Sequence, residues 1–325
     1  MRNKCLTYGP EPLSLIQSRD QTVGGVALDL GNLVNSTLKL GSESRTVNFR
    51  IDGTSLHALV PSDSMFFGIK DILFNREYEL FRAFELTRPR QVVIDAGANA
   101  GLYTIIASIG AEQVIAIEPD SQVFKTLSYN VSSNRLTNVV LKQSALSTTK
   151  GSVGFYKRGN TQLGSIRTRK NVGPILVDTI SLEELPDEGT EAQGRQIDLL
   201  KLDIEGSEFE LIQFSDEKSL RRVQRIVAEI HTEHGDISAL TSKLTRSGFN
   251  YVITKRPLKK IGRRRIRILA DYKMKLLMKA VDMTMSISRY SDWSSLLLFA
   301  SRERADFPAS ELDSLKSSLK EASLI

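Results

Sequence analysis

Short apolar runs alternate with segments of helical period between residues 91 and 254. The runs predict buried strands, and the longer segments between several of them predict helices. We expect strands at 92–94, 114–117, 139–141, 197–202, 225–230, 251–254 and, later in the chain, 295–299; the expected helices are 102–108, 121–133, 207–214 and 237–247. Continuous apolar strands separated by helices are typical of parallel sheets, so the pattern predicts an α/β fold with a doubly wound sheet.

The pattern before residue 91 is of another kind. Residues 46–51 and 55–60 alternate apolar and polar positions around Asp52-Gly53, which predicts a β-hairpin. Residues 69–87 carry apolar side chains on one helical side and predict a helix, while 152–156 and 175–180 predict an antiparallel pair of strands. We therefore expect an N-terminal extension over 1–88, a main domain over 89–305 and a C-terminal tail over 306–325.

Composition narrows the class of protein. Apolar residues make up 41% of the 325 residues and charged residues 25%, which is enough apolar mass for a large core and excludes a disordered chain. The only cysteine, Cys5, excludes an internal disulfide and a cysteine-based zinc site. The apolar runs are too short to span a bilayer, and the first twenty residues lack a secretory signal, so we expect a cytoplasmic protein.

Positive charge is concentrated in one segment. Residues 255–279 hold eleven Lys and Arg and one acid, whereas the net charge of the whole chain is +6, so the rest of the chain is mildly acidic. We expect a basic helical insert over 256–290, placed before the last strand. Such a local insert favours docking through Arg263 to Lys279 on a membrane or another anionic partner, with Arg263 to Arg267 binding an anionic part of the substrate. Its methionine-rich helical face favours packing over the protein's own sheet or in a dimer interface.

The first predicted strand runs into a glycine turn, D-A-G-A-N-A-G at 95–101. Gly97 permits a sharp turn and a close ligand, and Gly101 opens a helix whose N–H groups face that ligand. A dinucleotide fingerprint needs glycine where this chain has Asn99, which argues against NAD. Asp95 favours a ligand with a cationic or donor-rich group, such as the aminocarboxypropyl arm of S-adenosylmethionine. Asn99 either contacts that ligand or caps the helix.

A second acid follows the next strand. Glu118 and Pro119 end the strand at 114–117, and Glu118 lies 23 residues after Asp95. A carboxylate at this place accepts hydrogen bonds from both hydroxyls of a ribose. Together with the glycine turn it predicts a nucleoside-binding site.

These motifs resemble the FkbM-type class I S-adenosylmethionine-dependent methyltransferases. The resemblance rests on V-I-D-A-G-A-N-A-G-L-Y-T at 93–104, V-I-A-I-E-P at 114–119, L-K-Q-S-A-L at 141–146 and I-D-L-L-K-L-D-I-E-G-S-E at 197–208. It implies a Rossmann-like sheet of seven strands with the last one antiparallel, and S-adenosylmethionine as the cofactor. It also implies that Ser144 and Ala145 lie against the adenine, although an ordinary turn explains these small residues equally well.

Acids and a histidine end the fourth and fifth predicted strands. Asp203 ends a buried strand and should face the ligand crevice near the reacting sulfonium, and Glu205 could face the substrate. Glu229 and His231 share one side of the next strand. His231 is either a general base or a hydrogen-bonded histidine at the rim. Glu208 is expected to be structural, at the start of a helix.

Three functions remain open on these residues. The first is methylation of a hydroxyl on a glycan, a lipid-linked glycan or a small metabolite, with Asp203, His231, Glu205 or Glu229 as the catalytic groups. The second is an RNA methyltransferase that docks RNA on the basic insert. Enzymes that methylate nucleic-acid bases carry a different motif after the fourth strand, where this chain has D-I-E-G at 203–206. A nucleic-acid partner is therefore disfavoured. The third is a non-enzymatic module. A metal held by Asp203, Glu229 and His231 is a weaker alternative, and we expect none.

Overall fold

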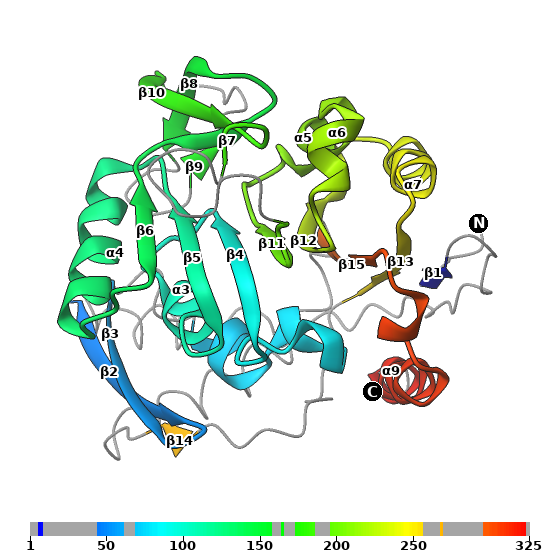
Figure 1. Cartoon of the computed structure of the whole chain (residues 1–325), viewed down its shortest axis with the longest axis horizontal. Helices are drawn as coiled ribbons and strands as arrows, with labels where there is room; N and C mark the ends of the chain where they lie inside the picture. The colour runs from blue at the N-terminus through cyan, green and yellow to red at the C-terminus, as the bar shows by residue number, and fades with distance from the viewer. Residues whose placement is uncertain are drawn as a thin grey trace, which may run out of the picture.

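The computed structural model describes residues 6–8, 44–61, 69–157, 164–165, 173–185, 196–255, 267–268 and 295–322. The strands of the central sheet are β1 (Leu6–Tyr8), β4 (Arg90–Ala96), β5 (Ala111–Ile117), β6 (Val139–Lys142), β11 (Leu199–Leu202), β12 (Arg225–His231), β13 (Asn250–Thr254) and β15 (Ser295–Ser301). Their order is β1-β13-β15-β12-β11-β4-β5-β6 (Figure 1).

The strand directions confirm the predicted fold class. β12, β11, β4, β5 and β6 pair in parallel, and β15 pairs antiparallel with both β12 and β13. These strands form the expected doubly wound sheet with an antiparallel last strand. β1 adds an antiparallel edge strand to β13, which the residue pattern did not predict.

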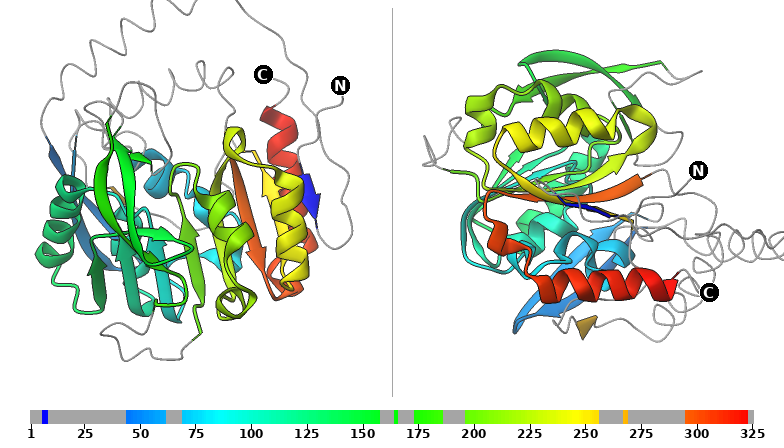
Figure 2. Two further views of the ribbon diagram at one scale, coloured as in Figure 1. Left: turned by 90° about the horizontal axis from the view of Figure 1, so that it is seen from above. Right: turned by 90° about the vertical axis from the view of Figure 1, so that its right-hand side faces the viewer.

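The helices cover the sheet in two layers. They are α3 (Leu102–Ala107), α4 (Ser121–Ser133), α5 (Glu208–Phe214), α6 (Glu217–Arg221), α7 (Ile237–Arg246) and α9 (Ala309–Ala322). Successive strand residues point to opposite faces. Val93 and Leu199 therefore join the core under the hairpin and α9, whereas Ile94 and Leu200 join the core under α5 and α7. Figure 2 shows α7 and α9 on opposite sides of the sheet.

A second, smaller sheet stands beside the carboxyl ends of the central strands. It contains β7 (Ala145–Ser147), β10 (Ile175–Ser181), β8 (Gly151–Lys157) and β9 (Gly164–Ser165), in that order. β8 and β10 pair antiparallel, as predicted for residues 152–156 and 175–180.

One prediction outside the central sheet was wrong. Residues 69–87 form three short turns rather than one helix: the π-helix η1 (Ile69–Phe74) and the 3-10 helices η2 (Glu77–Glu79) and η3 (Arg82–Phe84). Arg76 breaks the helix with a left-handed backbone (φ 50°), and buried Phe81 and Phe84 pack against aromatic rings of later elements. The predicted C-terminal tail contains α9, which buries Leu315 in the main core.

The predicted hairpin is confirmed, and one part of the basic insert joins it. β2 (Arg45–Ile51) pairs with β3 (Thr54–Val60), and β14 (Arg267–Ile268) pairs with β2. Asp52 in the hairpin turn accepts a hydrogen bond from Thr87 Oγ1 (2.9 Å), just before β4 begins. β14 therefore lies near the amino end of β4, at the lower edge of Figure 1. The rest of the insert, including Arg263 to Ile266 and the methionine-rich segment, lies outside the described residues.

Two asparagines of α4 attach the hairpin to the main domain. Asn130 Nδ2 donates to the carbonyls of Leu59 and Ala100, both at 2.7 Å, and its Oδ1 accepts from Leu59 N (2.7 Å). Asn134, one turn later, exchanges the same pair of hydrogen bonds with His57. The side-chain amides of Asn130 and Asn134 thus form hydrogen bonds with backbone N–H and C=O groups of β3, as a neighbouring strand would.

None of the helices in the described part of the chain has the length and apolar character needed to cross a bilayer.

We predict that Asn130→Ala lowers the free energy of unfolding by about 3 kcal/mol, because it leaves the buried backbone groups of Leu59 and Ala100 without partners. Urea denaturation followed by circular dichroism measures the loss. Gln122→Ala, an exposed position on the same helix, is the matched control and should change stability by less than about 0.5 kcal/mol. Equal losses in the two variants would contradict this role for Asn130.

Candidate functional site

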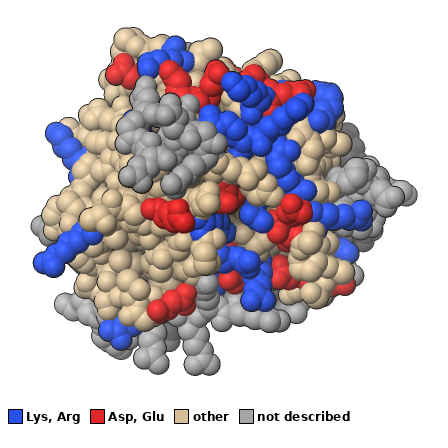
Figure 3. Space-filling model, viewed as in Figure 1, with Lys and Arg blue, Asp and Glu red and all other residues tan. Residues whose placement is uncertain are grey.

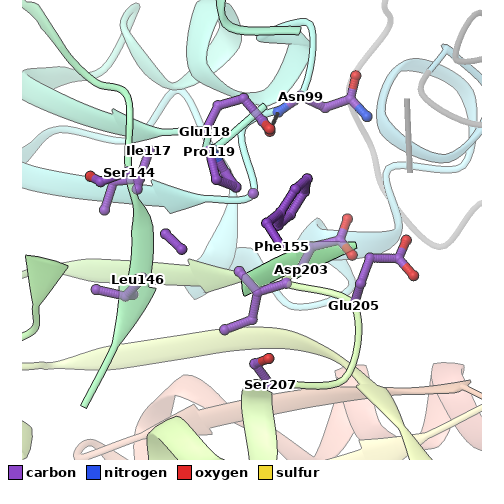
Figure 4. Close-up of a pocket in the computed structure, with 13 residues that line it drawn as sticks. Asn99, Ile117, Glu118, Pro119, Ser144, Leu146, Phe155, Asp203, Glu205 and Ser207 are labelled. Carbon is purple, nitrogen blue, oxygen red and sulfur yellow. Dashed lines mark hydrogen bonds between the residues drawn. The ribbon is translucent and has the colours of Figure 1, made fainter. Parts of the chain in front are cut away.

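A hollow opens at the carboxyl ends of β4, β5 and β11, beside the small sheet (Figure 4). It encloses about 610 Å³ of empty space, open solvent included. Its walls come from five separate parts of the chain, and they combine apolar and acidic side chains. The lining residues are Gly97, Asn99, Ile117, Glu118, Pro119, Ser144, Ala145, Leu146, Phe155, Asp203, Ile204, Glu205 and Ser207.

The glycine turn has a structural cause at both glycines. Gly97 adopts φ +74°, and a Cβ there would lie 1.9 Å from the carbonyl oxygen of Asp203. Gly101 adopts φ +88°, and its Cβ would lie 2.6 Å from Leu127 Cδ1. Gly97 is therefore required because β4 and β11 end close together, and Gly101 is required because α4 packs against the turn. Gly101 does not line the hollow, whereas Gly97 does.

Glu118 holds the glycine turn against the end of β5. Its Oε2 accepts from Asn99 N (3.0 Å), and its Oε1 accepts from Asp120 N (2.9 Å). Burial raises the pKa of Glu118 to about 7, although these two backbone N–H groups act in the opposite direction. A carboxylate has about four lone-pair sites, so each oxygen can accept one more hydrogen bond from a ligand hydroxyl.

Asn99 is not the helix cap that the sequence allowed. Its backbone is left-handed (φ 51°), and its Oδ1 accepts from the next residue, Ala100 N (2.6 Å). Gly101 occupies the N-cap position of α3. The rest of the Asn99 side chain lies at the hollow, beside Glu118 (Figure 4).

One wall of the hollow suits a flat apolar ring. Pro119, Ala145, Leu146 and Phe155 contribute apolar surface, and Phe155 points into the centre of the hollow (Figure 4). Residue patterns did not single out Phe155, because the small sheet brings it to the site from a segment without a motif. Ser207 in the opposite wall is 3% exposed, and its hydroxyl has no hydrogen-bond partner. This orphaned polar atom is a candidate ligand contact.

Asp95 lies beneath the hollow rather than in it. Its side chain is fully buried, its Oδ2 accepts from Thr104 Oγ1 (2.6 Å), and its Oδ1 lies 3.1 Å from Lys201 Nζ. Lys201 also donates to the carbonyl of Gly97 (2.8 Å). Burial alone would lower the pKa of Lys201, but Asp95 and Asp203 outweigh it and raise that pKa. Asp95 thus pairs with a lysine of the protein instead of facing a cationic ligand.

Asp203 borders the hollow and is held from behind. Tyr78 Oη donates to Asp203 Oδ2 (3.0 Å), and Lys201 Nζ lies 3.7 Å from the same oxygen. Glu229 Oε2 lies 3.5 Å from Tyr78 Oη. Tyr78 was not predicted as a site residue, because only the tertiary structure brings residues 69–88 beneath the ends of β11 and β12.

The loop after β11 is fixed by Glu208. Its carboxylate accepts from Ile204 N (2.8 Å) and Gly206 N (2.9 Å), which confirms its structural role through contacts other than the predicted helix dipole. Glu205 and Gly206 have left-handed backbones, and a Cβ on Gly206 would lie 2.2 Å from the ring of His234. His234 is therefore a packing residue of this loop and not only a surface side chain.

His231 carries a proton at neutral pH. Burial alone would lower its pKa, but the carboxylates of Glu208, Glu229 and Asp203 outweigh burial and raise the pKa to about 9. His231 Nδ1 lies 3.5 Å from Glu208 Oε1, and Nε2 lies 3.8 Å from Glu229 Oε1 and 3.9 Å from Glu205 Oε2. An imidazolium among three carboxylates holds them together and is a poor general base.

The hollow collects most of the predicted site residues from distant parts of the chain. Gly97, Asn99, Glu118, Pro119, Ser144, Ala145, Asp203 and Glu205 line it, while Asp95, Gly101, Glu229 and His231 are not among its lining residues. The roles assigned to these residues stay predictions. Among the described residues, no group of three His, Cys, Asp or Glu side chains is arranged to hold a metal ion.

Arg267, a described residue of the basic insert, does not lie at the hollow. Arg267 pairs with Arg50 on β2, at the amino end of β4, whereas the hollow lies at the carboxyl end. This position argues against an anionic part of the substrate held by Arg267 in the same hollow.

Comparison with known proteins supports one family. The model of the methyltransferase FkbM domain matches residues 95–251. The chain is 28% identical over 201 residues to 31-O-demethyl-FK506 methyltransferase FkbM of Streptomyces tacrolimicus, which covers 53% of this chain and 77% of that protein. It is 24% identical over 177 residues to methyltransferase 1 of Beauveria bassiana (strain ARSEF 2860), covering 48% and 71%.

Solved structures that are similar to this chain at low sequence identity include two named as methyltransferases. Methyltransferase FkbM from Methylobacillus flagellatus KT has 15% identity and a TM-score of 0.37, covering 73% of this chain and 54% of that one. A SAM-dependent methyltransferase from Agrobacterium tumefaciens has 9% identity and a TM-score of 0.44, covering 81% and 72%.

We predict that Lys201→Met lowers the free energy of unfolding by about 3–5 kcal/mol, because it leaves the buried Asp95 carboxylate without its cation. Combining it with Asp95→Asn should recover at least about 1 kcal/mol of that loss, since the double variant buries no unpaired charge. Urea denaturation of both single variants and the double variant measures the coupling. Lys125→Met, on the exposed side of α4, is the control, and strictly additive losses at residues 95 and 201 would contradict the coupling.

Proposed function

We propose that this protein, whose residues 95–251 match the model of the methyltransferase FkbM domain, transfers a methyl group from S-adenosylmethionine to a hydroxyl group of a glycan, a lipid-linked glycan or a small metabolite. The observation that carries the proposal is the hollow itself. It joins a buried carboxylate with spare lone pairs, an apolar wall for a flat ring and a cluster of acids at the carboxyl ends of β11 and β12.

The residues of the hollow fit the parts of S-adenosylmethionine. Glu118 would accept hydrogen bonds from the ribose hydroxyls, and Leu146 and Phe155 would flank the adenine. The orphaned hydroxyl of Ser207, in the wall opposite these apolar residues, supports the presence of a polar ligand in the hollow. When bound, the sulfonium supplies an electrophilic methyl group.

The acids of the site have two tasks in this proposal. Asp203 faces the hollow, where its carboxylate would stabilise a sulfonium charge. One of Asp203, Glu205 and Glu229 would take the proton of the acceptor hydroxyl, which becomes strongly acidic as its oxygen gains a methyl group. Since His231 is already protonated at neutral pH, we assign it to holding Glu205 and Glu229 rather than to proton removal. Most of the rate gain comes from fixing the reacting groups in line.

A hydroxyl acceptor has support from one relative. The name of the Streptomyces tacrolimicus protein describes a substrate that lacks a methyl group on an oxygen. The acidic cluster also disfavours an anionic acceptor at the point of transfer, and neutral hydroxyl groups donate well to carboxylates.

Nothing on the described residues favours RNA as the acceptor. On the face shown in Figure 3, basic and acidic side chains are interspersed over the region of α5 and α6, where Arg221 pairs with Glu217. An RNA-binding face is expected to be widely basic. We retain peripheral docking of Arg263 to Lys279 on a membrane or another anionic partner as a proposal, which rests on the charge of that segment alone.

We predict that S-adenosylhomocysteine binds the purified protein and that Glu118→Ala weakens this binding at least about 100-fold, because two charge-assisted hydrogen bonds are lost. Calorimetric titration measures both. Glu112→Ala, an exposed glutamate on the same strand, is the matched control and should bind like wild type. Absence of binding to wild type at near-millimolar ligand would refute the proposed cofactor.

We also predict that the same affinity falls as the pH drops below about 7, by up to about tenfold per unit. The free protein binds a proton at Glu118 with a pKa of about 7, whereas ribose hydroxyls donate best to the ionised form. Ligand binding should therefore release protons near neutral pH. Titrations in buffers of different ionisation enthalpy count the protons, and a pH-independent affinity between 5.5 and 8 would exclude this role of Glu118.

The acceptor class is tested with methyl-labelled S-adenosylmethionine and a panel of neutral sugars, glycolipids and small hydroxylated compounds, with RNA as the competing class. Label in an alkali-stable methyl ether supports the proposal. Label in RNA alone would replace the acceptor while keeping the cofactor.

A further inference from the structure

Tyr78 stands between two carboxylates at the inner end of the site. Its hydroxyl donates to Asp203 Oδ2 at 3.0 Å and lies 3.5 Å from Glu229 Oε2. A phenol has one hydrogen to donate, so it serves one carboxylate at a time, and the shorter contact selects Asp203. Lys201 Nζ approaches the same Asp203 oxygen at 3.7 Å. Two groups on one oxygen restrain rotation of the carboxylate and orient it.

The segment that carries Tyr78 is itself fixed by a buried ion pair. Arg76 donates to both oxygens of Glu79, at 3.0 and 2.8 Å, and the two side chains are almost fully buried. Glu79 Oε2 also accepts from Leu86 N (2.9 Å), which closes the segment into a loop. These contacts hold the backbone on both sides of Tyr78.

The ring of Tyr78 is held as firmly as its backbone. It packs edge-on against Tyr103, with 5.8 Å between ring centroids and an interplanar angle of 84°. Lys201 Nζ lies 5.7 Å from the centroid of each ring. Tyr78 is only 3% exposed. These contacts therefore fix the position of its hydroxyl beside Asp203.

We infer that Tyr78 is a positioning residue of the active site, which acts through Asp203 by orienting its carboxylate beside the sulfonium. Tyr78 belongs to a segment that precedes residues 95–251, the part matched by the family domain. The N-terminal extension is thus part of the catalytic unit. The inference rests on the proposed function, because it places Asp203 next to the sulfonium.

The charged groups that face Asp203 come from every element around it. Lys201 lies on β11, Asp95 on β4, Glu229 and His231 on β12, and Glu205 follows β11. Comparing S-adenosylmethionine with S-adenosylhomocysteine isolates the effects on the sulfonium, because the two ligands differ by the sulfonium charge and its methyl group. Asp203→Asn then separates the contribution of Asp203 from that of its charged neighbours. Titration of Glu118 affects both ligands alike and cancels in the ratio of their dissociation constants.

The experiment is calorimetric titration of both ligands with the full chain at about pH 7.5. Wild type should prefer the sulfonium ligand. Tyr78→Phe removes a hydrogen bond that orients the Asp203 carboxylate, so this preference should fall about three- to tenfold. Asp203→Asn should lower the preference further.

The matched control is Tyr103→Phe. Tyr103 is buried beside Tyr78 and faces the same lysine, but its hydroxyl has no hydrogen-bond partner. This variant should show the wild-type preference, and thermal unfolding checks that both tyrosine variants fold. A Tyr78→Phe preference equal to that of wild type, while Asp203→Asn lowers it, would overturn the role of Tyr78 and leave the proposed function intact. Failure of wild type to bind either ligand would overturn the proposed function and this inference with it.

Discussion

The buried contact between Lys201 and Asp95 is the interaction on which the site depends. The two residues sit side by side on β11 and β4, and neither side chain reaches solvent to any useful extent. A buried ion pair of this kind stabilises the fold little more than apolar residues of the same size would. Removing one partner is nevertheless strongly destabilising, because it leaves the other charge buried and unpaired. Lys201 also binds the carbonyl of Gly97 and approaches Asp203, so one ammonium group links the glycine turn, the centre of the sheet and the acidic cluster.

Strand geometry explains why polar groups collect at this place. Val93 and Asp95 share one face of β4, and Leu199 and Lys201 share the same face of β11. Side chains of a strand alternate between faces, so each apolar position is followed two residues later by a charged one at the carboxyl end. The apolar core under the hairpin is thus followed, toward the carboxyl ends of the strands, by a charged layer of Asp95 and Lys201 beneath the hollow. Burial strengthens the electrostatic interactions within that layer.

The N-terminal extension is integral to the domain rather than appended to it. Its hairpin is tied to α4 through Asn130, and its aromatic residues pack in the core of the central sheet. The same segment supplies Tyr78 beneath Asp203. The match to the FkbM domain covers residues 95–251, so this extension lies before the matched part of the chain.

The sequence alone determined the elements of the sheet and the turns that follow its strands. Period and apolar runs are local properties, so residues 121–133 form the predicted helix, and the strands predicted to end at residues 117, 202 and 254 end there. Glu118 and Asp203 follow from their places after strands. Only the tertiary structure decided which charges meet. It paired Asp95 with Lys201, made His231 a cation, and brought Tyr78 and Phe155 to the site. Each of these depends on strand order and on burial, which set neighbours and local dielectric across long separations in sequence, and no local pattern of residues encodes them.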